Sequence, residues 1–338
     1  MLEAQALSIH VASAQSLFDR PDFLASLEVQ TDPAYQIIYV DLGSGDVRGG
    51  SELEVTRPDV VRLRTFRNVG VVRGHNQAIA LALSRWARAD WHDRLIVLAR
   101  PEVAFDQAFC TSVRRAFVND PALMVAGPKV FRAENAAQTE GDWVELACTD
   151  QLYAAGIGMT RGRSLVFLGE GSQDSGQFDQ GASVIGFSDA CLVIRASCLE
   201  SLVLGENAWL DSRLPAFFAV LDLCWRAMQL GMRPKLIPEA RVWFAPEPHE
   251  RRIGSTWRAH YIPGVMRRNF DDVLLRLVHA PWAFFAYFRY RGSRLVHGGY
   301  WERRLRPNGL QEQTIGLKSW RRPDKATPLN ERLRWFLS

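Results

Sequence analysis

The sequence of 338 residues has few cysteines and no CxxC pair. The five cysteines are odd in number and lie in apolar surroundings, so we expect buried free thiols, a reducing cytoplasm and no zinc site; they are Cys110, Cys148, Cys191, Cys198 and Cys224. No stretch approaches the roughly 20 uninterrupted apolar residues that span a bilayer. No positively charged segment precedes the first apolar run. We therefore expect neither a transmembrane helix nor a signal peptide.

Charge is unevenly distributed along the chain, although the formal net charge is only +4. Residues 246–338 contain 18 Lys and Arg against 8 Asp and Glu, a net charge of +10, whereas residues 1–245 have a net charge of −6. A basic segment on an acidic body favours an anionic partner, either a membrane surface or nucleic acid. No nucleic-acid recognition motif accompanies this charge, so we expect no nucleic-acid partner.

The basic C-terminal region is also rich in aromatic residues. Residues 269–296 alternate arginines with residues such as Trp282 and Phe285, and Pro281 is expected to break or kink a helix there. Two interpretations stay open. The segment is a helix lying in a membrane interface, or it is an amphipathic helix packed on the body with its arginines solvated. We expect residues 246–338 to form a helical region separate from a domain over residues 1–245.

Short apolar runs alternate with helical periodicity over the first 245 residues. The runs predict strands at 7–12, 36–41, 60–66, 94–99, 122–131, 190–195 and 240–244. Helices are predicted at 22–29, 74–89, 106–119 and 217–231. Residues 132–187 are less regular and include a polar, glycine-rich loop at 169–183. This alternation predicts an α/β fold, a mixed or parallel sheet with helices on both faces, whose ligands bind at the carboxyl ends of the strands.

The segment LDSRLPAFFAVLDLCWR at 210–226 carries the strongest clue to function. It resembles the family 2 glycosyltransferase signature F-D-E-R-F-F-x-x-x-E-D-x-D-L-C-x-R. The matching residues are Asp211, Arg213, Asp222, Leu223, Cys224 and Arg226. The adjacent acidic pair, whose second member is the family's catalytic base, is Ala219-Val220 here. The resemblance covers roughly residues 6–244 and implies the GT-A fold, a Rossmann-like mixed sheet flanked by helices.

Two further segments resemble the family's nucleotide-binding motifs. YVDLGSGD at 39–46 places Asp41 at a strand end, where a carboxylate can bind a base or ribose, or simply cap a turn. RNVGVVRGHNQAI at 67–79 opens a helix, where glycines permit close backbone approach and the helix N-terminus favours phosphate. The resemblance implies these donor-binding residues: Val11, Ser13, Asp41, Arg67, Asn68, Gly70, Gly74, Asn76 and Arg100.

LIVLARPEV at 95–103 occupies the place of the family's acidic metal-binding motif, and only Glu102 remains as a carboxylate. Three interpretations stay open. Glu102 binds Mg²⁺ or Mn²⁺ together with the donor diphosphate. Arg100 neutralises the diphosphate, so that no metal is needed. The two side chains simply pair at the surface. PEARVWF at 238–244 resembles the family's P-E-A-x-V-x-H, whose terminal His, a metal ligand in some members, is Phe244 here.

An inverting transfer needs a group that takes the proton of the acceptor hydroxyl, and Val220 cannot do so. GFSDACLVIR at 186–195 resembles the family's S-G-A-x-x-L-x-R strand, with Asp189 in place of a glycine. We therefore take Asp189 and Asp211 as the candidate catalytic residues.

The sequence supports two hypotheses of different class. The first is an active glycosyltransferase, rhamnosyltransferase-like, that moves a sugar from a dTDP- or UDP-sugar to a glycan, lipid-linked or protein acceptor in bacterial surface polysaccharide synthesis. It would be cytoplasmic and peripheral on the inner membrane. The second is a pseudo-glycosyltransferase that retains the nucleotide-binding half and acts as a binding or scaffold subunit. We favour the first, because the donor-side motifs are retained.

Overall fold

The computed structural model describes residues 6–17, 20–45, 59–135, 146–159, 165–180 and 182–245. One compact unit comprises Met1–Gly158 and Phe167–Glu247, and the other comprises Met159–Val166 and Pro248–Ser338. Nearly all described residues belong to the first unit. The helical region predicted for 246–338 lies outside the described residues, so that region and its boundary stay predictions.

A nine-stranded mixed sheet forms the centre of this unit, in the order β3-β2-β1-β4-β10-β6-β11-β5, with β7 paired to β6. β10 is antiparallel to β4 and β6, while β1, β2, β3, β4, β6 and β11 all run in one direction. A separate pair contains β8 and β9. The strands are β1 (Ala6–Ser13), β2 (Tyr35–Asp41), β3 (Val60–Arg64), β4 (Arg94–Ala99), β5 (Val103–Phe105), β6 (Val125–Asn135), β7 (Leu146–Ala154), β8 (Ile157–Met159), β9 (Leu165–Phe167), β10 (Cys191–Arg195) and β11 (Lys235–Phe244).

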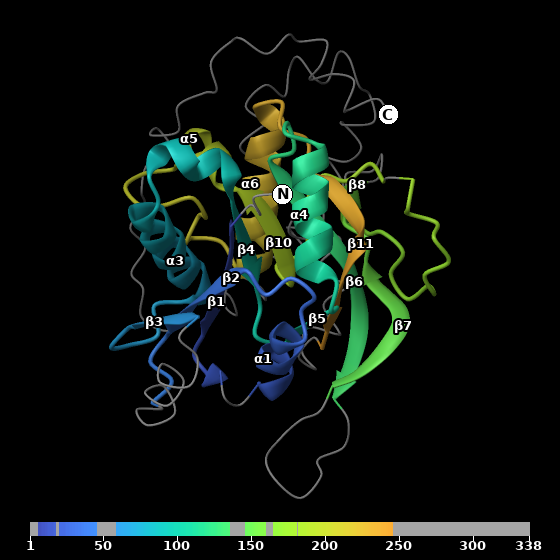
Figure 1. Cartoon of the computed structure of the whole chain (residues 1–338), viewed down its shortest axis with the longest axis horizontal. Coiled ribbons are helices and arrows are strands. Elements are labelled where there is room, and N and C mark those ends of the chain that lie inside the picture. The colour runs from blue at the N-terminus through green and yellow to red at the C-terminus, as the bar shows by residue number, and fades with distance from the viewer. Residues whose placement is uncertain are drawn as a thin grey trace, which may run out of the picture. The chain divides into compact units, whose positions relative to one another are not determined.

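Helices cover both faces of the sheet because its central strands are apolar on both sides. In β4, Leu95 and Val97 pack into one core cluster, whereas Ile96 and Leu98 pack into the other. The first cluster includes side chains of α1 and α4, and the second includes side chains of α3, α5 and α6, on the opposite face (Figure 1). The helices are α1 (Pro21–Glu28), α3 (Val71–Arg85), α4 (Phe109–Asn119), α5 (Leu199–Leu202) and α6 (Ala216–Gln229), with short 3-10 segments η2 (Arg88–Asp93) and η3 (Ala196–Cys198).

The α/β architecture predicted from the sequence is confirmed, with differences in detail. Four observed strands were not predicted: β5, β8 and β9 have three residues each, and β7, LACTDQLYA, mixes polar and apolar residues without clear alternation. β11 continues through Pro238, where its register with β6 shifts between Ile237 and Arg241. A proline is tolerated at such an irregularity because no ladder hydrogen bond is required of it.

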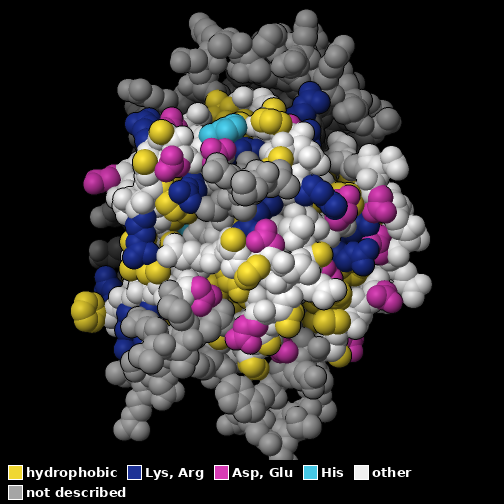
Figure 2. Space-filling model, viewed as in Figure 1, with side chains coloured by type: hydrophobic (Ala, Val, Ile, Leu, Met, Phe, Trp, Pro, Cys, Tyr) yellow, Lys and Arg dark blue, Asp and Glu magenta, His cyan; other side chains and the backbone are white. Residues whose placement is uncertain are grey.

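Four of the five cysteines are buried as expected, but the prediction is wrong for Cys148, which is exposed on β7. Among the described residues no helix is both long and apolar enough to cross a membrane. Lys and Arg side chains are interspersed with Asp and Glu over the described part of the face shown in Figure 2. Such mixing is typical of a solvated surface.

Candidate active site

Several predicted site residues meet where parallel strands end at one edge of the sheet. β1 ends at Ser13 and β2 at Asp41, and the register of the two strands sets these residues side by side. β4 ends at Ala99, and Arg100 follows it. The backbone N–H of Arg100 donates to the carbonyl of Ala190, just before β10, at 3.1 Å. The topology therefore brings segments that are far apart in the sequence to the edge where α/β sheets bind ligands.

Val11 and Ser13 have structural contacts of their own. Val11 is fully buried in the core and lies between Tyr39 of β2 and Ala99 of β4. The hydroxyl of Ser13 accepts a hydrogen bond from the backbone N–H of Gln15 at 3.0 Å, which fixes the turn after β1. Donor contacts at these two positions stay predictions.

Asp41 is fully buried at the end of β2 and surrounded by donors. Its carboxylate accepts the backbone N–H of Ser44 at 2.8 Å and a guanidinium N–H of Arg62, and Nε of Arg64 lies 3.6 Å away. Burial acts to raise the pKa of Asp41, but the hydrogen bonds from Ser44 and Arg62 outweigh burial and lower it. Asp41 is thus an ionised cap of the turn, and any contact with a base or ribose would be made in addition to these bonds.

The loop before α3 has the geometry of an open helix N-terminus. Oδ1 of Asn68 accepts the backbone N–H of Gly70 at 2.8 Å. Gly70 has φ +88°, which L side chains rarely adopt, and no heavy atom lies within 4 Å of the place a Cβ would occupy. Arg67 and Asn68 are exposed. This arrangement leaves space beside the first turn of α3, where a phosphate group is favoured by the helix dipole and the unpaired N–H groups.

The other two matched residues of this motif have packing roles. A Cβ on Gly74 would lie 2.8 Å from the Cβ of Ala12, so glycine allows α3 to pack closely against β1. Asn76 is buried, and its Oδ1 accepts the backbone N–H groups of Trp209 and Leu210 at 3.0 and 2.9 Å. Its Nδ2 donates to the carbonyl of Leu210 at 2.8 Å. Asn76 therefore ties α3 to the segment that leads into Asp211.

Arg100 is the centre of a small charged cluster at the same edge. Its Nε donates to Oε2 of Glu102 at 2.9 Å, and its NH1 lies 3.7 Å from Oδ2 of Asp189. The guanidinium carbon lies 5.0 Å from the ring centre of Phe244, a cation–π contact. NH2 of Arg20, from the loop after β1, lies 3.9 Å from Oε1 of Glu102. Two guanidinium groups and two carboxylates thus balance one another.

The residues at this edge do not fit a divalent metal ion. Each oxygen of Glu102 already has a guanidinium beside it, from Arg100 or Arg20. A metal ion bound to Glu102 would lie close to these positive charges, and like unit charges about 4 Å apart repel by about 4 kcal/mol per charge near a protein surface. Within the described ranges no cluster of three or more His, Cys, Asp and Glu is arranged to hold a metal. Glu102 as a metal ligand is therefore not supported by its surroundings.

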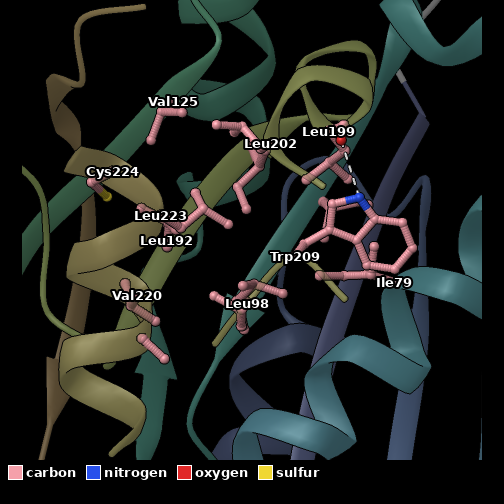
Figure 3. Packing of buried hydrophobic residues seen from close by; sticks show 14 of the residues in the cluster. Ile79, Leu98, Val125, Leu192, Leu199, Leu202, Trp209, Val220, Leu223 and Cys224 are labelled. Carbon is pink, nitrogen blue, oxygen red and sulfur yellow. Dashed lines mark hydrogen bonds between the residues drawn. The ribbon is translucent and has the colours of Figure 1, made fainter. Parts of the chain in front are cut away.

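In the signature segment, Asp211 is bound by an arginine. The two positions that hold the family's acidic pair, Ala219 and Val220, lie in the core. Nε and NH2 of Arg213 donate to the two carboxylate oxygens of Asp211, each at 2.7 Å, and Asp211 is 4% exposed. Ala219 and Val220 lie in α6 at 0% and 3% exposure, and Val220 packs in the cluster that contains Leu98 and Leu223 (Figure 3). An aliphatic residue at position 220 is thus part of the core packing, and a charged acid would be poorly accommodated there.

Asp222 also has a structural place. Its Oδ2 accepts Nε of Arg226 at 2.9 Å, and Arg226 donates to the carbonyls of Leu202 and Trp209. These bonds fasten α6 to the same backbone segment that Asn76 holds. Asp189, with a side chain 15% exposed, is thus the acid at this edge that the resemblance does not account for.

Sequence reasoning missed three partners of the predicted residues: Arg62, Arg20 and Phe244 as a stacking ring. A polar residue inside the strand VVRLR is a weak sign of a buried ion pair, and it could have pointed to Arg62. The strand order brings Arg20 close to Glu102 and Phe244 close to Arg100. The local sequence does not reveal that order.

No family model and no curated protein matches this sequence. Among solved structures, the chain is similar to GalNAc-T7 with UDP, GalNAc and Mn²⁺, at a TM-score of 0.54 and 10% identity, over 73% of this chain and 45% of that one. It is also similar to the mannosyltransferase PcManGT from Pyrobaculum calidifontis in complex with GDP-Man and Mn²⁺, at a TM-score of 0.50 and 13% identity, over 87% and 75%. The chain spans less than half the length of GalNAc-T7. These likenesses show the fold, which is the GT-A fold of glycosyltransferases.

Proposed function

We propose that this chain is a glycosyltransferase that uses a nucleoside-diphosphate sugar. The donor would lie at the carboxyl edge of the sheet, with its nucleoside near Asp41 and its diphosphate between the loop at 67–76 and Arg100. The observation that carries this proposal is the charged cluster around Arg100 at the ligand-binding edge of a GT-A fold. The open space at Gly70 beside the N-terminus of α3 supports it.

In this proposal Asp189 takes the proton of the acceptor hydroxyl in an inverting hexosyl or deoxyhexosyl transfer. Support comes from its place beside Arg100. The residue at the position of the family's base is Val220, which is buried in the core and cannot accept a proton. The resemblance favours a dTDP- or UDP-sugar donor and a glycan or lipid-linked acceptor in bacterial surface polysaccharide synthesis. The basic charge of residues 246–338 favours peripheral binding to the inner membrane.

A second candidate, a pseudo-glycosyltransferase that binds a nucleotide or glycan without turnover, is favoured by a specific observation. Positions 219 and 220 are hydrocarbon side chains packed in the core, and Asp211 and Asp222 are each held by an arginine. Ala219 and Val220 have no group that accepts a proton, and the carboxylates of Asp211 and Asp222 are each engaged by an arginine.

The experiment that separates the two candidates is a thermal-shift screen of the full chain against UDP-, dTDP- and GDP-sugars, followed by an assay for released nucleotide. Stabilisation by a sugar nucleotide with nucleotide release is the expected result. Stabilisation without release, even with candidate acceptors, would favour the binding subunit. If no nucleotide stabilises the protein, the donor site proposed here is wrong.

A further inference from the structure

At the edge where the resembled family carries metal-binding residues, this chain places the guanidinium of Arg100 against the ring of Phe244. The strand ends that carry the acidic motif and the terminal His in the resembled family carry Arg100 and Phe244 here. β5, directly after Glu102, pairs with β11, so that Phe244 lies opposite Val103. The guanidinium carbon of Arg100 lies over the ring of Phe244, 5.0 Å from its centre.

Arg100 is held in this place from several sides. Its backbone N–H donates to Ala190 at 3.1 Å, and its carbonyl accepts the N–H of Val103 at 3.3 Å. Phe244 is 1% exposed and packs edge to face against Tyr153, with ring centres 5.2 Å apart. Both members of the stack are therefore positioned by the sheet before any ligand arrives, which reduces the entropy lost on binding.

We propose that Arg100, stacked on Phe244, binds the diphosphate of the nucleotide in place of a divalent cation, so that binding needs no metal. This inference rests on the proposed function. A guanidinium presents a planar set of N–H donors that matches the oxygens of a phosphate, and it carries a fixed charge.

A bound diphosphate would replace Asp189 as a partner of Arg100. At 3.7 Å the contact between Arg100 and Asp189 is an ion pair longer than a hydrogen bond, whereas the bond to Glu102 is 2.9 Å. A diphosphate oxygen that takes over this side of the guanidinium leaves the hydrogen bond to Glu102 in place and breaks the contact with Asp189. Donor binding then changes the surroundings of the proposed base.

The test is isothermal titration calorimetry of the full chain with UDP, dTDP and GDP, and with the matching nucleosides, in EDTA and in MnCl₂. For the nucleoside diphosphate that binds, the same dissociation constant is expected in both buffers. Arg100→Gln should weaken diphosphate binding about 10- to 100-fold, the loss of a charge-assisted hydrogen bond, with nucleoside binding unchanged. Arg88→Gln, at a side chain 76% exposed and paired with Glu200, is the matched control.

Phe244→Leu keeps most of the buried volume but removes the π system, and it should weaken diphosphate binding by a few fold, with nucleoside binding again unchanged. Diphosphate binding that requires Mn²⁺, or that is unaltered in Arg100→Gln, would overturn the inference while leaving the proposed function in place. The absence of binding by every nucleotide would instead remove the proposed function, and this inference with it.

Discussion

The side-chain amide of Asn76 brackets the backbone of Leu210, donating to its carbonyl at 2.8 Å and accepting its N–H at 2.9 Å. Oδ1 of Asn76 also accepts a hydrogen bond from the backbone N–H of Trp209 at 3.0 Å. Trp209 in turn packs beside Ile79 and donates its indole N–H to the carbonyl of Leu199 (Figure 3). A residue expected from its motif to contact the donor is thus a buried link between two parts of the fold.

Asn76→Ala is expected to destabilise the folded protein in the absence of any nucleotide. The substitution leaves buried backbone groups of Trp209 and Leu210 without partners, and we expect the free energy of unfolding to fall by about 3 kcal/mol. In a domain of this size that corresponds to a melting temperature lower by roughly 10 °C, measurable by differential scanning calorimetry.

Asn68→Ala is the matched control for Asn76, because its amide is exposed and makes one local bond to Gly70. Its melting temperature should stay close to that of the wild type. If Asn76→Ala melts like the wild type and instead weakens nucleotide binding, the donor-binding role expected from the motif is correct. The hydrogen bonds from Asn76 to Trp209 and Leu210 would then not be important for stability.

Lys129 of β6 anchors the polar loop at 169–180. Its side chain is 2% exposed, and Nζ donates to Asp174 at 2.7 Å and to Asp179 at 2.5 Å. Burial acts to raise the pKa of Asp174, but the bonds from Lys129 and from the N–H of Gly176 outweigh it and lower the pKa. Lys129→Met would leave Asp174 as a largely buried charge without its cation, and we expect a loss of about 3 kcal/mol in unfolding free energy, measured by urea denaturation.

Limited proteolysis gives a local readout of the same substitution, with faster cleavage within 169–180 expected for Lys129→Met. Lys235→Met is the control, since Lys235 is 58% exposed and its pair with Asp120 is at the surface; it should cost less than about 1 kcal/mol. Equal cleavage and equal stability of the wild type and Lys129→Met would mean that the loop is held by its backbone bonds and not by the lysine.

Two buried histidines should make the folded protein less stable in mild acid. Burial lowers the pKa of His10 on β1 to about 3, with a smaller effect of His75, and burial lowers the pKa of His75 on α3 to about 4. In the unfolded chain both titrate near 6.5, so below that pH the unfolded state takes up protons that the folded state does not. The free energy of unfolding should therefore fall as the pH decreases through 6.5 toward 4.

Between pH 7 and pH 5 we expect a loss of roughly 2 kcal/mol per histidine, measured by urea denaturation at each pH. His75→Gln removes one titrating group and should reduce the loss by about half. Asp41, whose pKa is lowered, contributes below this range, because its stabilisation is complete above the unfolded pKa of about 4. Equal unfolding free energies at pH 7 and pH 5 would contradict the assignment.

The sheet was predictable because its central strands are short apolar runs. β4 and β10, RLIVLA and CLVIR, need no context to be recognised as buried strands. β7 was not predictable in the same way, since its polar residues are accommodated by pairing with β6 alone. Gly70 and Gly74 were found by their motif, but their different uses, a positive φ and a close packing contact, depend on what lies beside each one.

The pairing of the charged residues at this edge was predictable only in part. Arg100 and Glu102 are two positions apart in the sequence, and their contact was among the open interpretations. The stack of Arg100 on Phe244 joins residues 144 positions apart through the antiparallel pairing of β5 and β11. The sequence showed only that Phe244 stands where some family members have a metal-binding His. Its contact with the Arg100 guanidinium could not be predicted without knowing the order of the strands.

Comparison of Asp189→Asn with Asp211→Asn distinguishes the two candidate catalytic acids. If Asp189 takes the acceptor proton, Asp189→Asn should lower turnover by about 10²- to 10⁴-fold without weakening nucleotide binding, and the acidic limb of the pH–rate profile should disappear. Asp211→Asn replaces a carboxylate that is 4% exposed and bound twice by Arg213. Its main effect should be a lower melting temperature, because the guanidinium loses its charged partner.

The conservative variant Asp189→Glu tests the same assignment from the other direction. A carboxylate on a longer side chain restores part of the turnover if proton transfer is the role of position 189, and the acidic limb returns with it. A side chain that merely pairs with Arg100 would instead show its effect in nucleotide affinity, since the guanidinium would lose one carboxylate partner. Full turnover in Asp189→Asn would place the base elsewhere, and Asp211 would then be the remaining candidate at this edge.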